Sequence, residues 1–322
     1  IQKISLFCNV PSNAVIPSYD VESIYQVPNL LSKSKLDDLV IKKLNIKSPK
    51  KKDLTNWINF EILESRAKED LKIYIIGKYV HLKDSYKSLY EAIYHAGVHN
   101  KANVIIRWLD SETINSKNVS DLLKSASGIL IPGGFGNRGI NGKIEAIKFA
   151  RENQIPFLGI CLGMQLSIIE FAKNVLKIKN AGSSEFGRYK NNLISLMTEW
   201  NFQNKKIKRS KDTDLGATMR LGSYPCHIKA NSLASKIYKN KLIKERHRHR
   251  YEVNPKFRIQ LEKKGLIFSG FSKDKKLLEI IENKNHKWFL GVQFHPELKS
   301  KPFKPHPIFL SFIKNSLDYK NE

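Results

Sequence analysis

Residues 157–166, FLGICLGMQL, constrain the fold of this chain more than any other segment. An apolar run typical of a buried strand leads through Gly159 and Gly163, which flank Cys161, into a helical pattern. This spacing predicts a tight strand-to-helix turn, with the cysteine at positive φ and its thiol above the helix N-terminus. The helix dipole would stabilise a thiolate, and the N–H of Leu162 would face a developing oxyanion. The alternative is that Cys161 is a small buried core residue, as free cysteines commonly are.

Strands and helices alternate over most of the chain from Leu71 onward. The predicted strands cover residues 72–77, 103–109, 128–131, 155–160, 266–269, 277–281 and 289–293, and the predicted helices cover 84–95, 143–152 and 162–175. This alternation favours an α/β fold with a mostly parallel central sheet and helices on both faces. Some of the late strands are expected to be antiparallel.

The first 70 residues have a different pattern. Residues 3–10 form a short apolar run that predicts a strand, and residues 24–44 are amphipathic. The lysine-rich segment 45–53 predicts a linker, and residues 57–69 predict a helix. We therefore expect an N-terminal part at 1–45, a linker at 46–69, a large α/β domain at 70–318 and a tail at 319–322. The chain opens with Ile1, without an initiator methionine, and residues 4–10 already have a strand pattern, which suggests a piece of a longer protein.

A histidine follows the last of the predicted strands. His295 lies in the sequence FLGVQFHPE, where Pro296 restricts the backbone and Glu297 comes two residues later. A thiolate that attacks an amide needs a partner to protonate the leaving nitrogen, and a carboxylate can set the tautomer of that imidazole. A lone histidine after a strand is more often structural. Together with the cysteine turn, this segment predicts a triad of Cys161, His295 and Glu297.

A glycine-rich turn, IPGGFGNRG, follows the predicted strand at 128–131. Residues 134–139 fit the letters G-x-G-x-x-G, but Cys161 holds the position at which a dinucleotide-binding fold needs an acidic residue. The spacing around Lys143 also differs from that of a P-loop. We expect a flexible turn whose backbone N–H groups complete an oxyanion hole beside Cys161, with phosphate binding as the alternative.

Composition narrows the classes of protein that remain. The chain has 322 residues, of which 41% are hydrophobic and 27% charged, as in an ordinary globular protein with a sizeable core. Its apolar stretches fall far short of the roughly 20 residues that a membrane helix needs, so no membrane partner is expected. Three cysteines, Cys8, Cys161 and Cys226, cannot form a disulfide framework, which favours a reducing compartment and a cytoplasmic location.

The charge of the chain is unusual, with 56 basic and 30 acidic residues and a net charge of +26. Such an excess is typical of proteins that bind nucleic acid. Lysine is nevertheless spread along the whole chain, and the dense runs at 47–52 and 205–211 lack interleaved aromatic residues for base stacking. We expect solvated loops there, with phosphate or nucleic-acid contact as the alternative.

Several of these segments resemble the class I, triad-type glutamine amidotransferases: GICLGMQ at 159–165, PGGFG at 132–136 and FHPE at 294–297. Further segments resemble the CTP synthase family in particular: FCNVP at 7–11, DVESIY at 20–25, GATMRLG at 216–222 and ERHRHRYEVN at 245–254. The resemblance covers nearly the whole chain. Residues 1–45 are similar to the end of the synthetase domain of that family, and residues 70–318 to its glutaminase domain.

The resemblance implies roles for individual residues. Cys161 would attack the side-chain amide of glutamine to form a thioester, His295 would shuttle the proton, and Glu297 would orient the imidazole. The backbone N–H groups of Gly134 and Leu162 would form the oxyanion hole. The residues implied in glutamine binding are Gly134, Leu162, Gly163, Met164, Gln165, Glu185 and Arg250, with Glu185 suited to the ammonium group and Arg250 to the carboxylate. A nucleotide site would include Lys3, Tyr19, Asp20 and Val21.

The family's reaction uses ammonia from glutamine to convert UTP into CTP at the expense of ATP with Mg²⁺, and GTP is its activator. The resemblance therefore implies glutamine, UTP, ATP and GTP as partners, and a homotetramer. This chain carries no phosphate loop, and no metal ligands are expected in it, so we expect it to perform the glutaminase half-reaction. The alternatives are a stand-alone hydrolase of γ-glutamyl amides with the same triad, or a basic homologue that binds nucleic acid.

Overall fold

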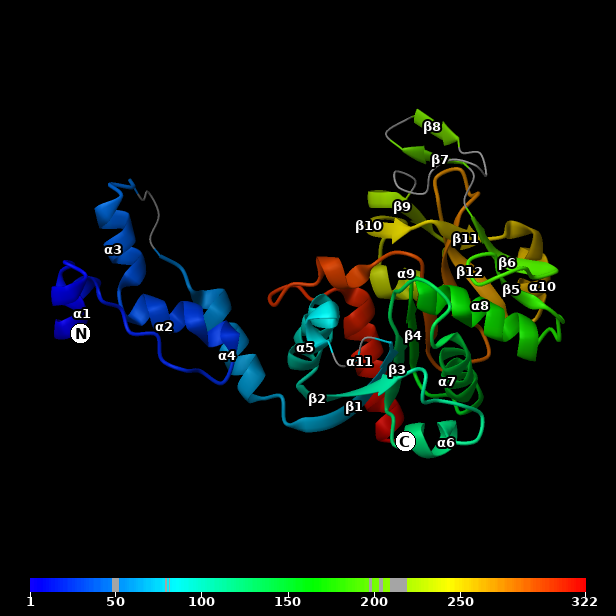
Figure 1. Ribbon diagram of the computed structural model, residues 1–322, viewed down its shortest axis with the longest axis horizontal. Helices are drawn as coiled ribbons and strands as arrows, with labels where there is room; N and C mark the ends of the chain where they lie inside the picture. Colours follow the sequence, from blue (N-terminus) through cyan, green and yellow to red (C-terminus); the bar gives the residue numbers. More distant parts are fainter. Residues whose placement is uncertain (48–51, 79, 81, 197–198, 203–204, 209–218) are drawn as a thin grey trace. The chain divides into compact units, whose positions relative to one another are not determined.

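The computed structural model describes residues 1–47, 52–78, 80, 82–196, 199–202, 205–208 and 219–322 (Figure 1). Contacts between residues divide the chain into two units, Ile1–Lys68 and Glu69–Glu322. Both lysine-rich runs, 47–52 and 205–211, lie partly outside the described residues.

The described elements of the first unit are helical. They are α1 (Gln2–Phe7), η1 (Ser12–Ala14), η2 (Ile24–Gln26), α2 (Val27–Lys33), α3 (Leu36–Lys43) and α4 (Thr55–Ser65). The amphipathic segment is divided into α2 and α3 near Lys35, whose φ is 58°. The first unit has a small buried centre. It includes Tyr25 and Phe60, whose ring centroids are 4.8 Å apart, and Asn29, which donates a hydrogen bond to Glu61 at 2.8 Å.

The strand predicted at residues 3–10 is wrong, because α1 occupies most of this segment. A strand needs a neighbouring strand for its backbone hydrogen bonds, and the described part of this unit contains none. A helix satisfies the same groups within itself. Leu6 and Phe7 are 80% and 86% exposed, so burial on a sheet does not direct this segment either. A short apolar run is compatible with both structures, and its pattern alone cannot distinguish them.

The second unit is built on a nine-stranded sheet with the order β10-β9-β12-β13-β14-β4-β3-β1-β2 (Figure 1). The parallel half contains β1 (Glu69–Gly77), β2 (Ala102–Asp110), β3 (Gly128–Ile131), β4 (Phe157–Ile160) and β14 (Phe289–Val292). The antiparallel half contains β9 (Arg220–Ile228), β10 (Leu242–His249), β12 (Leu266–Phe271) and β13 (Leu278–Asn283). The predicted α/β fold is confirmed, as is the antiparallel direction of some late strands.

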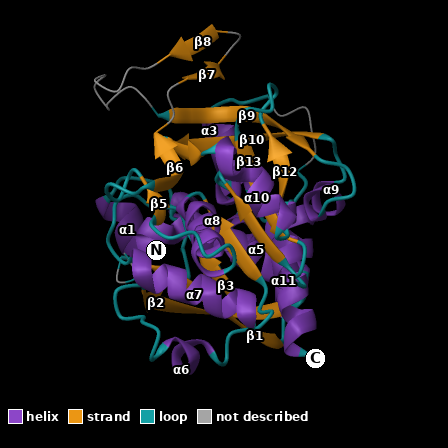
Figure 2. Cartoon of the chain, turned by 90° about the vertical axis from the view of Figure 1, so that its right-hand side faces the viewer, coloured by secondary structure: helices purple, strands orange, loops and turns teal. Residues whose placement is uncertain are grey.

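Helices cover both faces of this sheet. On one face pack α5 (Lys87–His99), α9 (Leu233–Tyr238) and α11 (Pro307–Lys320), and on the other α6 (Val119–Leu123), α7 (Ile140–Glu152), α8 (Leu162–Asn174) and α10 (Arg258–Lys263). Successive strand residues point to opposite faces, so that Ile73 and Ile75 belong to the α5/α11 cluster while Tyr74 and Ile76 belong to the α7/α8 cluster. Figure 2 shows the sheet from the side of α7 and α8. Burial on both faces explains why the central parallel strands β3, β4 and β14 are continuous apolar runs.

Smaller elements complete the second unit. They are η3 (Lys83–Tyr86), β5 (Ala181–Ser183), β6 (Asn191–Leu196), β7 (Glu199–Phe202), β8 (Lys205–Lys208), β11 (Tyr251–Val253), η4 (Pro255–Phe257) and η5 (Pro296–Lys299). The predicted helices and strands of the parallel half are present with shifted ends; for example, the helix expected at 84–95 is η3 followed by α5. None of the helices within the described ranges has the length and apolar character that crossing a membrane requires.

Candidate active site

Cys161 lies at the turn between β4 and α8. Its φ of 52° and ψ of −100° form a backbone conformation that non-glycine residues rarely adopt, so the predicted strain at this turn is confirmed. The flanking glycines allow the turn to close, because a Cβ on Gly159 would lie only 2.7 Å from the backbone of Gly163. The thiol is 3% exposed and lies at the first turn of a 13-residue helix.

Strand β14 brings the histidine segment beside this turn. It runs parallel to β4, with Val292 opposite Ile160, and the N–H of Cys161 donates to the carbonyl of Val292 at 2.7 Å. The chain that follows β14 therefore passes directly beside Cys161. Gln293 and His295 both lie near Cys161, the first at 3.6 Å from its sulfur and the second across Gly133 from its Cβ.

His295 and Glu297 form a close pair. Nδ1 of His295 lies 2.7 Å from Oε1 of Glu297, and the two side chains are 14% and 13% exposed. Burial lowers the pKa of His295, but the interactions with Cys161 and Glu297 outweigh it and raise this pKa to about 11. Nε2 is buried and makes no hydrogen bond within the described residues. The imidazole of His295 therefore keeps its proton at neutral pH.

The glycine-rich turn after β3 lies between these groups. A Cβ on Gly133 would be 2.7 Å from Cε1 of His295 and 3.5 Å from Cβ of Cys161, so only glycine allows their close approach. A Cβ on Gly134 would be 3.4 Å from the Leu162 side chain, so the glycine turn packs against the start of α8. The first N–H groups of a helix have no partner inside it, so that of Leu162 is available to an oxyanion. Sequence reasoning identified Gly134 and missed Gly133.

Glu185 lies at the same turn, and Arg250 is close enough to interact with it electrostatically. Oε1 of Glu185 accepts a hydrogen bond from the N–H of Gly136 at 2.7 Å. Burial raises the pKa of Glu185, while Gly136, Lys78 and Arg250 oppose this rise. Nε of Arg250 is buried and has no hydrogen-bond partner among the described residues. A carboxylate and an incompletely bonded guanidinium are thus within electrostatic reach of each other beside the glycine turn.

The remaining residues implied in glutamine binding belong to the start of α8. Gln165 is 3% exposed, and its Nε2 donates to the carbonyl of Tyr251 and to Oε1 of Gln293, both at 3.0 Å. Both hydrogens of this amide are therefore in use, and its oxygen is the part left for a ligand. Gly163 packs against the backbone of β3, and the Met164 side chain is fully buried in the α7/α8 cluster. These two residues could contact a ligand through their backbone.

The predicted nucleotide residues belong to the first unit. Lys3, Tyr19 and Asp20 are exposed, and Val21 is half-buried. Their role stays a prediction. In the part of the chain that the structure describes, no group of histidine, cysteine and acidic side chains is suited to a metal ion.

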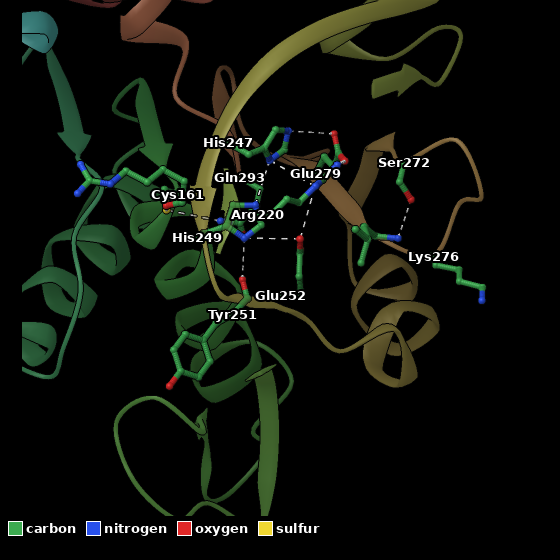
Figure 3. Close-up of polar contacts among 12 residues, drawn as sticks. Cys161, Arg220, His247, His249, Tyr251, Glu252, Ser272, Lys276, Glu279 and Gln293 are labelled. Carbon is green, nitrogen blue, oxygen red and sulfur yellow. Dashed lines mark hydrogen bonds and ion pairs between the residues drawn. The ribbon is translucent and has the colours of Figure 1, made fainter. Parts of the chain in front are cut away.

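A buried charged cluster behind Cys161 was not found from the sequence (Figure 3). Arg220 lies 2.6 Å from Glu279 and 3.5 Å from Glu252, and its Nη1 is 3.3 Å from Nδ1 of His247. That Nδ1 is 3.0 Å from Nε2 of His249. Burial, with Arg220 nearby, holds the pKa of both histidines well below the usual value. The signal was the alternation of β10, in which three of the four inward positions carry polar residues: Glu245, His247 and His249.

Comparison with known proteins agrees with this geometry. Residues 81–315 match the family model of class-I glutamine amidotransferases, and residues 1–46 match that of the CTP synthase N-terminus. The CTP synthase of Pelagibacter ubique is 56% identical over 319 residues, covering 99% of this chain and 59% of that protein. The CTP synthase of Rhodospirillum rubrum is 50% identical over 315 residues, covering 98% of this chain and 58% of that protein.

A solved structure supports the same relationship. The glutaminase domain of Trypanosoma brucei CTPS, with bound acivicin, superposes with a TM-score of 0.70 at 35% sequence identity, covering 77% of this chain and 94% of that domain. The chain spans 59% and 58% of the length of the two curated relatives above. It belongs to the CTP synthase family, and residues 81–315 are its class I glutamine amidotransferase domain.

Proposed function

We propose that this chain hydrolyses glutamine to glutamate and ammonia with Cys161 as the nucleophile. The observation that carries this proposal is the position of the His295–Glu297 pair beside the strained cysteine turn, with Gly133 between them. An amide is a poor substrate because its leaving nitrogen must be protonated. A histidine that keeps its proton next to a thiol meets this requirement.

Each group has one role in the proposed reaction. The thiolate of Cys161 attacks the amide carbon, and the oxyanion that forms accepts hydrogen bonds from the N–H groups of Gly134 and Leu162. His295 then gives its proton to the nitrogen, the C–N bond breaks, and ammonia leaves from a thioester. Water, deprotonated by His295, next splits the C–S bond to release glutamate and restore the thiol. Glu297 keeps the imidazole oriented and stabilises its charged form.

Glu185 and Arg250 would select the amino-acid end of the substrate. Arg250 offers a buried Nε that is not hydrogen-bonded within the described residues, which suits the α-carboxylate of glutamine. Glu185 offers a carboxylate oriented by the N–H of Gly136, which suits the α-ammonium group. Gly163, Met164 and Gln165 would line the side-chain end. An amide without this zwitterionic end would lose both contacts.

We propose further that the ammonia serves the amination of UTP to CTP, with ATP and Mg²⁺ as cofactors, GTP as activator, and a cytoplasmic homotetramer as the assembly. The match of residues 1–46 to the CTP synthase N-terminus supports this proposal. We assign residues 1–45 to the end of the synthetase domain, where Lys3 and 19–21 would approach a nucleotide, 46–69 to a linker, 70–318 to the glutaminase domain and 319–322 to a tail.

The proposal is tested by measuring glutamate release from glutamine. Cys161→Ser should abolish it, while Cys226→Ser, the matched buried cysteine, should retain it. The electrophilic analogue 6-diazo-5-oxo-norleucine should label Cys161 and leave Cys8 and Cys226 unmodified, as read by mass spectrometry. Burial raises the pKa of the Cys226 thiol well above its usual value, which keeps that thiol protonated and unreactive. Glutamate release by Cys161→Ser, or stoichiometric label at either other cysteine, would refute the proposal.

A further inference from the structure

We propose that Gln293 is a hydrogen-bond donor to Cys161 Sγ that positions the sulfur and stabilises it as a thiolate. This inference rests on the proposed role of Cys161 as nucleophile. Nε2 of Gln293 lies 3.6 Å from Sγ, a distance typical of an N–H donor and sulfur (Figure 3). The Gln293 side chain is completely buried, so water does not compete for this contact.

A chain of hydrogen bonds determines which end of the Gln293 carboxamide faces the sulfur. The carbonyl oxygen of Tyr251 can only accept, so the group of Gln165 that lies 3.0 Å from it must be the NH₂. The same NH₂ is 3.0 Å from the next carboxamide, which must therefore present its oxygen, Oε1 of Gln293. The remaining end of Gln293 is its NH₂, and this end points to Sγ. The carbonyl of Tyr251 therefore fixes the orientation of Gln165, and Gln165 in turn fixes the orientation of Gln293, whose NH₂ is the donor to Sγ.

The backbone of Gln293 is held as firmly as its side chain. Its N–H donates to the carbonyl of Glu279 on β13 at 2.9 Å, and the residue before it pairs with the end of β4. Glu279 is itself bonded to Arg220 in the buried charged cluster. Gln293 directly follows β14 and is bonded to β13, and a donor anchored in this way to the sheet keeps its position more accurately than one on a free loop.

A carboxamide complements the histidine because it cannot transfer its proton. His295 must give up its proton to the departing ammonia, whereas Gln293 keeps its hydrogen throughout the reaction. Sulfur is negatively charged before the attack and again when water splits the thioester. A hydrogen bond to sulfur is stronger in these charged states than in the thioester, because charge assistance strengthens it. Gln293 would therefore assist both the approach of the thiolate and its departure.

The experiment compares Gln293→Met, which keeps the length of the side chain without a donor, with the wild-type chain. The matched control is Gln154→Met, whose carboxamide bonds to Asn285 and Lys287 away from the site. Alkylation of Cys161 by iodoacetamide is followed by mass spectrometry, together with kcat and KM for glutamine and the melting temperature. We expect alkylation about tenfold slower near neutral pH, with a deficit that narrows as pH rises, because alkali forms the thiolate without help. We expect kcat to fall at least tenfold and KM to change little, with Gln154→Met equal to the wild type in all readouts.

Two further variants keep the test decisive. Gln293→Glu replaces the donor with an acceptor of the same shape, and its alkylation should be slower than that of Gln293→Met. If either variant of Gln293 folds poorly, Gln165→Met releases the carboxamide without removing it and should slow alkylation partially. Alkylation at the wild-type rate in a folded Gln293→Met or Gln165→Met chain would overturn the inference, as would a change confined to KM. Iodoacetamide reports on the thiol whether or not glutamine is hydrolysed, so failure of the proposed function would be recognised separately, by glutamate release from Cys161→Ser.

Discussion

Replacing Glu252 with glutamine should change how the stability of the second unit depends on pH. Glu252 is 5% exposed, and neither of its carboxylate oxygens has a hydrogen-bond partner within the described residues. Burial raises its pKa from the ordinary 4.5 to about 8; Arg220 opposes this rise, and Glu279 adds to it. At neutral pH the folded protein therefore holds a proton on Glu252 that the unfolded chain releases.

The sign and size of the effect follow from this difference. Because the folded pKa lies above the unfolded one, the stabilising contribution is complete below pH 4.5 and is lost as the pH rises toward 8. Each pH unit in this window is worth about 1.4 kcal/mol. The wild type should lose about 2.5 kcal/mol of unfolding free energy from this group between about pH 5 and pH 7, and about 1.4 kcal/mol more by about pH 9. A glutamine side chain at position 252 does not titrate, so Glu252→Gln removes this pH-dependent loss of unfolding free energy.

Urea titrations followed by tryptophan fluorescence, at several pH values from 5 to 8, measure the effect. The unfolding free energy of Glu252→Gln minus that of the wild type should rise by about 2.5 kcal/mol between about pH 5 and pH 7. Glu152→Gln, which changes a half-exposed carboxylate, is the control and should show no comparable rise. A difference that stays flat over this range, or falls, would refute the reasoning that Glu252 is protonated in the fold.

Three further substitutions test the geometry. Gly133→Ala would place a Cβ 2.7 Å from Cε1 of His295, so glutamate release should fall about a hundredfold with little change in melting temperature; wild-type turnover would contradict the placement of His295. Arg220→Met leaves Glu279 buried without its ion partner and should lower the free energy of unfolding in urea by about 3–5 kcal/mol. Adding Glu279→Met should recover most of this loss. A loss that the second substitution does not reduce would count against the ion pair. Gly163→Ala would push a Cβ into the backbone of β3 and should cost about 1–3 kcal/mol by calorimetry, whereas an unchanged melting curve would mean that α8 lies farther from β3.

The parallel half of the sheet could be predicted because its signals are local. Strands β3, β4 and β14 are continuous apolar runs, since both of their faces are buried. Helical patterns follow β3 and β4 in the sequence. Strands β9 and β10 were not predicted. The inward positions of β10 include Glu245, His247 and His249, so the face that is buried is polar and gives no hydrophobic alternation. Their burial depends on ion pairs from other strands, such as Arg220 and Glu279, which no window of sequence contains.

The residues of the candidate site also differ in whether a local motif indicates them. Cys161, His295 and Glu297 could be predicted from the sequence because each lies in a short motif whose chemistry is visible locally. Gly133 and Gln293 were missed because their importance comes from the pairing of β14 with β4, which brings distant residues into contact. Glycine at position 133 is needed only once His295 approaches it, and Gln293 becomes a donor only once Cys161 stands opposite.

The pairing of β4 with β14 also has a consequence for the biosynthesis of the protein. Cys161 and Gln293 are 132 residues apart in the sequence, and His295 follows two residues later. At about 5–20 residues per second, a ribosome adds this interval in roughly 7–26 seconds. During that time the chain already contains Cys161 but lacks β14 and the residues that follow it. Those residues include His295, Glu297 and Gln293, the hydrogen-bond donor to the sulfur. The proposed hydrolytic site therefore cannot form before Glu297, the last member of the predicted triad in the sequence, has been synthesised.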